Sequence, residues 1–169
     1  SAFSRYATEV WALENGGYAD CLMVATVAAV ISYIPLGFLA SKIGRKKSIL
    51  MGIVGLFIGF FYVGFFIQYH FMINLGFVLI GVSWGAINVN SFPMVVEIAN
   101  DGDVGKYTGY YYVFSMAAQI LTPVLSGILL QKVSYITLFP YACVFSVLAF
   151  LTMIMVKHGD TRPVAKKSV

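Results

Sequence analysis

Charged residues are scarce in this chain. Only 11% of its 169 residues are Asp, Glu, Lys or Arg, and 60% are hydrophobic, whereas soluble domains carry about 25% charged residues. Four stretches contain no charged residue at all: 21–40, 48–96, 107–131 and 133–156. This deficit excludes an ordinary water-soluble fold and indicates an integral membrane protein.

The chain also lacks the clustered side chains that an enzyme needs. Its two cysteines, Cys21 and Cys143, and its two histidines, His70 and His158, are far apart in the sequence. No nucleophile–base set and no metal-ligand spacing occurs in the apolar stretches. We therefore expect no enzyme activity, no metal and no cofactor, and we expect the cysteines to act as small buried hydrophobes.

The charge-free stretches predict five membrane-spanning helices. A helical span needs about 20 apolar residues, so 48–96 is long enough for two helices, joined at a polar waist around Gln68 and His70. The stretches do not alternate as barrel strands do, and the predicted fold is an all-α membrane protein. The expected helices of this 21–157 bundle are 21–41, 48–68, 71–98, 106–131 and 134–157.

The distribution of positive charge predicts the topology. Alternating spans place nine of the eleven Lys and Arg on one side: Lys42, Arg45, Lys46, Lys47, Lys106, Lys157, Arg162, Lys166 and Lys167. Only Arg5 and Lys132 fall on the other side. Because Lys and Arg accumulate in cytoplasmic loops, we expect a cytoplasmic tail at 158–169. Residues 1–20 then hold the end of a sixth, preceding helix and a non-cytoplasmic loop. Because the cations are spread over membrane loops, we expect the lipid bilayer as a partner and we expect no nucleic-acid binding.

The third predicted helix carries polar residues on two faces. Trp84, Asn88 and Ser91 are spaced i, i+4 and i+7, so they share one face, while Asn90 lies on another. Pro93 also frees a backbone carbonyl. Amides in hydrocarbon need a partner or water. The helix is therefore expected to line a cavity, with hydrogen bonding between helices as the alternative.

The fourth predicted helix has one continuous polar stripe. Its members recur at intervals of three or four residues: Tyr112, Ser115, Gln119, Thr122 and Ser126. The second and fifth helices are apolar nearly all round, as lipid-facing helices are. A solute pathway explains why the third and fourth helices have polar faces and the second and fifth do not. Association between helices is the alternative role for the stripe.

A basic turn links the first two predicted helices and resembles a known family. Its pattern is Gly37-x-x-x-Ser41-Lys42-x-Gly44-Arg45-Lys46. This resembles the loop between the second and third helices in each half of a major facilitator superfamily transporter, with Ser41 where the family has an acid. The resemblance implies half of that fold. It also implies a gating loop that packs against the start of helix 106–131 and holds the cytoplasmic side closed.

A second resemblance covers residues 84–130. The run Asn88-x-Asn90-Ser91-x-Pro93, the acidic glycine loop and the Tyr-rich helix after it look like sucrose-transporter-like proteins and the related glycoside–pentoside–hexuronide cation symporters. This likeness implies that the chain is a fragment, the C-terminal half of such a transporter. Its five helices would then be helices eight to twelve, of which the eighth, tenth and eleventh face the cavity.

Together, these features predict a secondary active transporter, a cation-coupled sugar symporter working by alternating access. Its expected partners are a small-molecule solute such as a sugar, a coupling cation (proton or sodium) and the missing N-terminal half, in the plasma membrane. A membrane scaffold or assembly subunit is the alternative. The expected substrate-binding residues are Trp84, Asn88, Asn90, Ser91, Tyr112, Ser115, Gln119 and Thr122. The expected gating-loop residues are Gly37, Ser41, Lys42, Gly44, Arg45, Lys46, Glu97, Asp101 and Asp103, and Arg45 can pair with any of these three acids.

Overall fold

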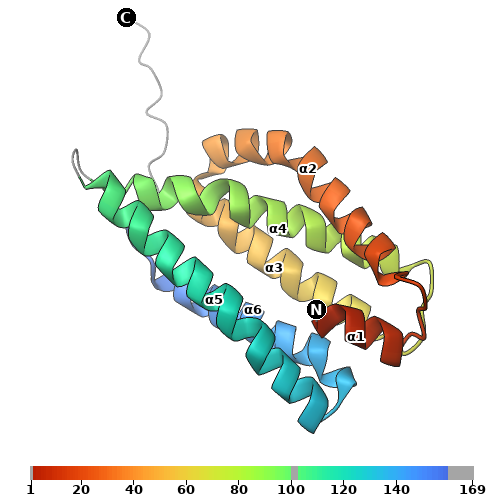
Figure 1. The fold of residues 1–169 in the computed structure, drawn as a ribbon. Coiled ribbons are helices and arrows are strands. Elements are labelled where there is room, and N and C mark those ends of the chain that lie inside the picture. Colours follow the sequence, from red (N-terminus) through yellow and green to blue (C-terminus); the bar gives the residue numbers. More distant parts are fainter. Residues whose placement is uncertain (1, 100–102, 160–169) are drawn as a thin grey trace, which may run out of the picture.

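The computed structural model describes residues 2–99 and 103–159, and within them the chain is all-helical (Figure 1). In chain order the elements are α1 (Ala2–Glu9), α2 (Tyr18–Ile43), α3 (Arg45–Gly64), α4 (Ile73–Val96), α5 (Val104–Lys132), the 3₁₀ turn η1 (Tyr135–Thr137) and α6 (Leu138–Met155). The five segments that begin with α2, α3, α4, α5 and η1 are long and apolar enough to cross a membrane. This confirms the predicted all-α membrane fold, and α1 is a short additional helix before the five spans.

The basic turn is shorter than the sequence suggested. Lys42 lies in the last turn of α2, and Arg45 already begins α3, so Gly44 alone separates the two helices. Lys and Arg are good helix formers, which explains why the cations extend the helices. Gly44 has φ +97° and ψ 150°, a conformation open to glycine and very costly for other residues.

The helices α3 and α4 form the centre of the bundle, where small residues let their backbones approach. A Cβ added to Gly52 would lie 2.8 Å from the carbonyl oxygen of Ser83, and one added to Gly59 would lie 2.6 Å from Ile80 Cγ1. Close approach at small residues is the usual way in which membrane helices pack. On the two sides of this pair, α2 packs against α4 and α6 packs against α3.

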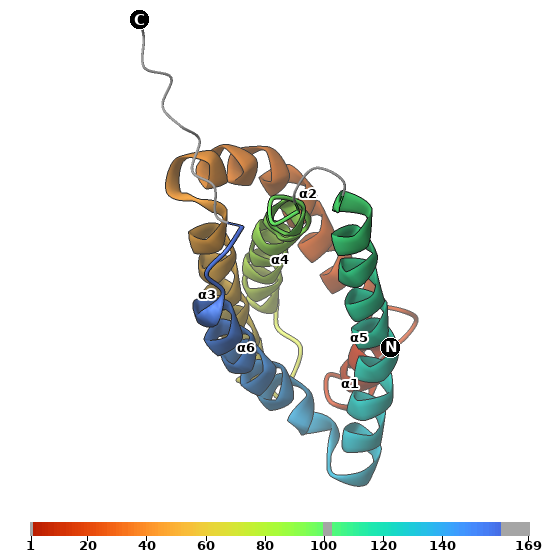
Figure 2. The same ribbon diagram turned by 90° about the vertical axis from the view of Figure 1, so that its left-hand side faces the viewer.

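The helix α5 stands apart from α3 and α6 along most of its length (Figure 2). Of its residues, only Ser126 and Leu130 are buried. Its contacts are with α4, where Phe92 meets Tyr111, with α1, with the turn η1 and with α6. Most of α5 is therefore left uncovered within the described part of the chain.

An aromatic cluster holds the opposite end of the bundle together. Tyr6 and Trp11 are 2% and 5% exposed, and both rings pack against Phe139 at the start of α6. Trp11 also donates its indole hydrogen to the carbonyl oxygen of Phe66, at 2.8 Å. Burial of large rings with the N–H satisfied stabilises such a cluster, and here it fixes α1 to the outer ends of α3 and α6.

Candidate solute-binding face and basic cluster

The predicted binding face of α4 is exposed. Trp84 is 55% exposed, and Asn88, one turn further on, is exposed and donates a hydrogen bond to the Trp84 carbonyl oxygen at 3.0 Å. Ser91 is half-buried and donates to the Ile87 carbonyl oxygen at 2.5 Å. These bonds stay within one helix and bring no other helix to this face. The indole ring and the amide of this face are therefore accessible.

The polar stripe of α5 is also accessible, except at Ser126, which is buried. Tyr112 is 50% exposed, and Gln119 and Thr122 are exposed as well. Gln119 donates its amide hydrogen to Ser115 Oγ at 3.4 Å, one turn away on the same helix. Within the described residues, no side-chain hydrogen bond links the stripe to α4 or α6. The polar groups of the stripe therefore make no hydrogen bond across to these helices in the described part of the chain.

Asn90 has a different environment from Asn88. Its side chain is 2% exposed, and its Nδ2 donates to Ser48 Oγ on α3 at 3.1 Å and to the Ala86 carbonyl oxygen at 2.8 Å. Two residues correspond to about 200° around a helix, which puts the two asparagines on nearly opposite faces. The structure therefore places Asn90 between α3 and α4, in the role that the sequence left open as hydrogen bonding between helices.

Two aromatic residues complete the meeting point of α4 and α5, and the sequence reasoning did not select them. The ring of Phe92 lies 5.6 Å from that of Tyr111 and 6.1 Å from that of Tyr112, between centroids. Phe92 follows Asn88 by four residues, so helical spacing was a signal for it. The contact of Tyr111 across to α4 has no signature in the sequence.

The cations at the start of α3 tie three helix ends together. Arg45 Nη2 lies 2.7 Å from Glu97 Oε1, directly after α4, with the two side chains 30% and 24% exposed. Lys46 Nζ donates to the carbonyl oxygens of Ile154 and Val156 at the end of α6, at 2.8 and 2.6 Å. A cation at a helix C-terminus satisfies carbonyls that lack partners and is favoured by the helix dipole. The ends of α3, α4 and α6 thus form one cluster.

The other predicted gating residues lie outside this cluster. Ser41 Oγ donates to the Phe38 carbonyl oxygen at 2.7 Å within α2, and a Cβ added at Gly37 would meet nothing within 4 Å. Asp103 is exposed and makes no side-chain cap for α5, and Asp101 lies outside the described residues. The expected packing of the turn against the start of α5 is not observed, because the end of α4 lies between them (Figure 2).

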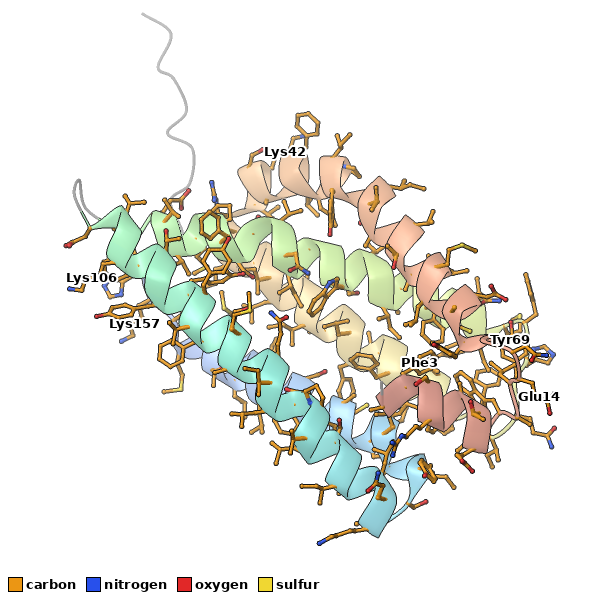
Figure 3. The ribbon with its side chains drawn as sticks, viewed as in Figure 1. Phe3, Glu14, Lys42, Tyr69, Lys106 and Lys157 are labelled. Atoms are coloured by element: carbon orange, nitrogen blue, oxygen red, sulfur yellow. The ribbon has the colours of Figure 1, made fainter. Side chains whose placement is uncertain are left out.

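The two ends of the bundle differ in charge. Lys42, Lys106 and Lys157 lie toward one end, whereas Glu14 and Tyr69 lie at the other (Figure 3). Such an asymmetry is what the rule on positively charged cytoplasmic loops describes. The fold thus separates a cationic end from an aromatic end, with the exposed faces of α4 and α5 between them.

Comparison with known families agrees with this architecture. The family model of the Major Facilitator Superfamily matches residues 12–169, nearly the whole chain. Comparisons with curated proteins and with solved structures gave no match. Members of this family are transporters of small solutes rather than enzymes, and they lie in the lipid bilayer. Because the match covers all five candidate spans, the chain belongs to the Major Facilitator Superfamily and is a membrane transporter chain.

Proposed function

We propose that this chain is the C-terminal half of a cation-coupled sugar symporter of the plasma membrane, with its C-terminus in the cytoplasm. The observation that carries the proposal is the contrast between helices. α4 and α5 leave Trp84, Asn88 and Gln119 exposed, although polar groups facing hydrocarbon are costly. Such faces are expected to line a water-filled pathway between two halves that alternate in access.

The chemistry of the exposed face suits a neutral polyhydroxylated solute. The Trp84 ring offers a flat apolar surface, and amides and hydroxyls both donate and accept hydrogen bonds. The binding set that we propose is therefore Trp84, Asn88, Ser91, Tyr112, Ser115, Gln119 and Thr122. Asn90 is assigned to the α3–α4 contact, because its amide is buried against Ser48.

The coupling acid is proposed to lie in the other half of the transporter. No Asp or Glu occurs between residues 21 and 96 or between 104 and 156, and proton relays in membranes need such groups. Glu97 lies at the cytoplasmic end and is paired with Arg45. The chain thus supplies part of the sugar-binding face and of the cytoplasmic closure, while a cation, proton or sodium, binds elsewhere.

The second candidate function is a scaffold or assembly subunit, and the exposed apolar surface of α5 favours it.

Uptake of a labelled disaccharide into proteoliposomes by the full-length gene product separates the transporter from the scaffold. The variants Asn88→Leu and Gln119→Leu are expected to lose uptake while the purified protein keeps its size on gel filtration. Loss of assembly in the two variants, with no uptake by the unchanged protein, would favour the scaffold.

A further inference from the structure

The four cations at the basic turn between α2 and α3, within residues 42–47, fall into two groups of two. Arg45 and Lys46 are half-buried and contact Glu97 and the end of α6, as described above. Lys42 and Lys47 are exposed, and neither forms an ion pair or hydrogen bond within residues 2–99 and 103–159. The ammonium groups of Lys42 and Lys47 are therefore unpaired in the described part of the chain, whereas Arg45 and Lys46 both have partners.

The two unpaired lysines border one pocket. It is lined by Lys42, Ile43, Lys47, Leu50 and Met51 and has a volume of about 600 Å³. Its wall is mainly aliphatic, its charged members are both ammonium groups, and no carboxylate is among the residues that line it. The pocket therefore combines a cationic rim with an apolar floor.

The position of the pocket restricts what can fill it. Lys42 is in the last turn of α2 and Lys47 in the first turn of α3, at the cationic end of the spans, whereas Met51 is one turn deeper and 58% exposed. The rim thus lies at the depth of lipid headgroups and the floor faces the acyl region. A soluble anion would neutralise the lysines but would leave the aliphatic floor in water.

We propose that this pocket binds the headgroup of an anionic phospholipid. The lipid phosphate lies between Lys42 and Lys47, and one acyl chain runs along Leu50 and Met51. Basic pockets on the cytoplasmic side of membrane helices are suited to such headgroups, and each Lys near the surface contributes favourably to binding anionic lipid. The site depends on the membrane-spanning fold and on its cationic end facing the anionic leaflet. It does not depend on which solute is carried.

Native mass spectrometry tests the proposal on the full-length gene product in neutral detergent, titrated with phosphatidylglycerol or phosphatidylcholine. The double variant Lys42→Gln/Lys47→Gln is expected to weaken phosphatidylglycerol binding about 20-fold and to leave phosphatidylcholine binding unchanged. The matched control is Lys106→Gln/Lys157→Gln, which removes the same charge at the same end outside the pocket. Equal loss in both double variants, or no loss in the first, would overturn the site.

A second measurement locates the lipid. Phosphatidylglycerol with a diazirine in its acyl chain is expected to label the peptide that contains Leu50 and Met51, and this label is expected to disappear in Lys42→Gln/Lys47→Gln. Millimolar inorganic phosphate is expected to leave the labelling intact, because it cannot fill the aliphatic floor. Labelling spread evenly over the spans, or displaced by phosphate alone, would contradict the proposal. Thermal unfolding without added lipid checks that the variants are folded.

Discussion

Arg45 Nη2 and Glu97 Oε1 lie 2.7 Å apart and join the start of α3 to the end of α4. Both side chains are partly shielded, so the pair is expected to contribute about 1 kcal/mol, at the upper end for exposed pairs. Arg45→Gln and Glu97→Gln should each lower the free energy of unfolding by about that amount in a detergent denaturation assay. High salt should weaken the wild-type contribution, because such pairs are screened.

The charge swap is the control for this pair. Arg45→Glu/Glu97→Arg should recover part of the lost stability, giving a coupling free energy of about 0.5–1 kcal/mol in a double-mutant cycle. A cycle with no coupling would show that the two groups act independently and that the contact does not hold the helix ends together.

Gly44, in the basic turn, and Gly37, inside α2, should respond differently to the same substitution. Gly44→Ala places a Cβ on a residue with φ +97°, and the strain should cost about 1–3 kcal/mol of stability. The Cβ that Gly37→Ala adds has no neighbouring atom within 4 Å, so this variant should leave the stability unchanged. Thermal unfolding of the two variants measures the difference.

Transport assays extend this comparison to the other conformations of the protein. The family resemblance implies that the gating loop, which includes Gly37, packs against a neighbouring helix, whereas the structure leaves Gly37 open. Normal transport by Gly37→Ala is the result that the structure predicts. Reduced transport with unchanged stability would instead show that the contact forms in another state of the transport cycle.

Gly81 should be the least tolerant glycine at the α2–α4 contact. A Cβ there would collide with the backbone of Ala25, lying 2.8 Å from its carbonyl carbon and 2.9 Å from its Cα as well as against the carbonyl oxygen. Because backbone cannot move aside as a flexible side chain does, Gly81→Ala should cost about 1–3 kcal/mol by overpacking. Chemical denaturation in detergent provides the measurement.

Gly127→Ala on α5 is the matched variant, since an added Cβ there has no neighbour within 4 Å. It should be neutral or slightly stabilising, because alanine is the better helix former. If both variants lost the same stability, glycine content rather than the α2–α4 contact would be the cause.

The spans were predictable because charge depletion over about 20 residues has few structural explanations. Helical spacing also separated Asn88 from Asn90, but it did not identify the neighbour of each face. That neighbour is set by how α3 packs, which brings Ser48 to Asn90. Periodicity defines a face of one helix, whereas the partner depends on contacts between helices.

The cluster that Arg45 and Lys46 form with the ends of α4 and α6 was predictable only in part. The sequence offered three acids for Arg45, and the structure pairs it with Glu97. The contact of Lys46 with the Ile154 and Val156 carbonyl oxygens was missed, because backbone acceptors are the same for every residue type and leave no signature. The length of the basic turn was overestimated because its cations were interpreted as loop residues.

The contrast between Asn88 and Asn90 gives the most direct test of the central claim, that the exposed face of α4 contacts the solute. Asn90→Leu should lower stability by about 0.6–2 kcal/mol, since it removes a hydrogen bond between helices, and should leave solute affinity unchanged in the folded fraction. Asn88→Leu should leave stability nearly unchanged.

The deciding measurement is the solute concentration at half-maximal uptake by the full-length gene product with each variant. Asn88→Leu is expected to weaken the apparent affinity for the transported solute at least about tenfold, equal to about 1.4 kcal/mol, and Asn90→Leu is expected to leave it unchanged. Equal affinities in Asn88→Leu and the unchanged protein would contradict a solute-binding role for this face.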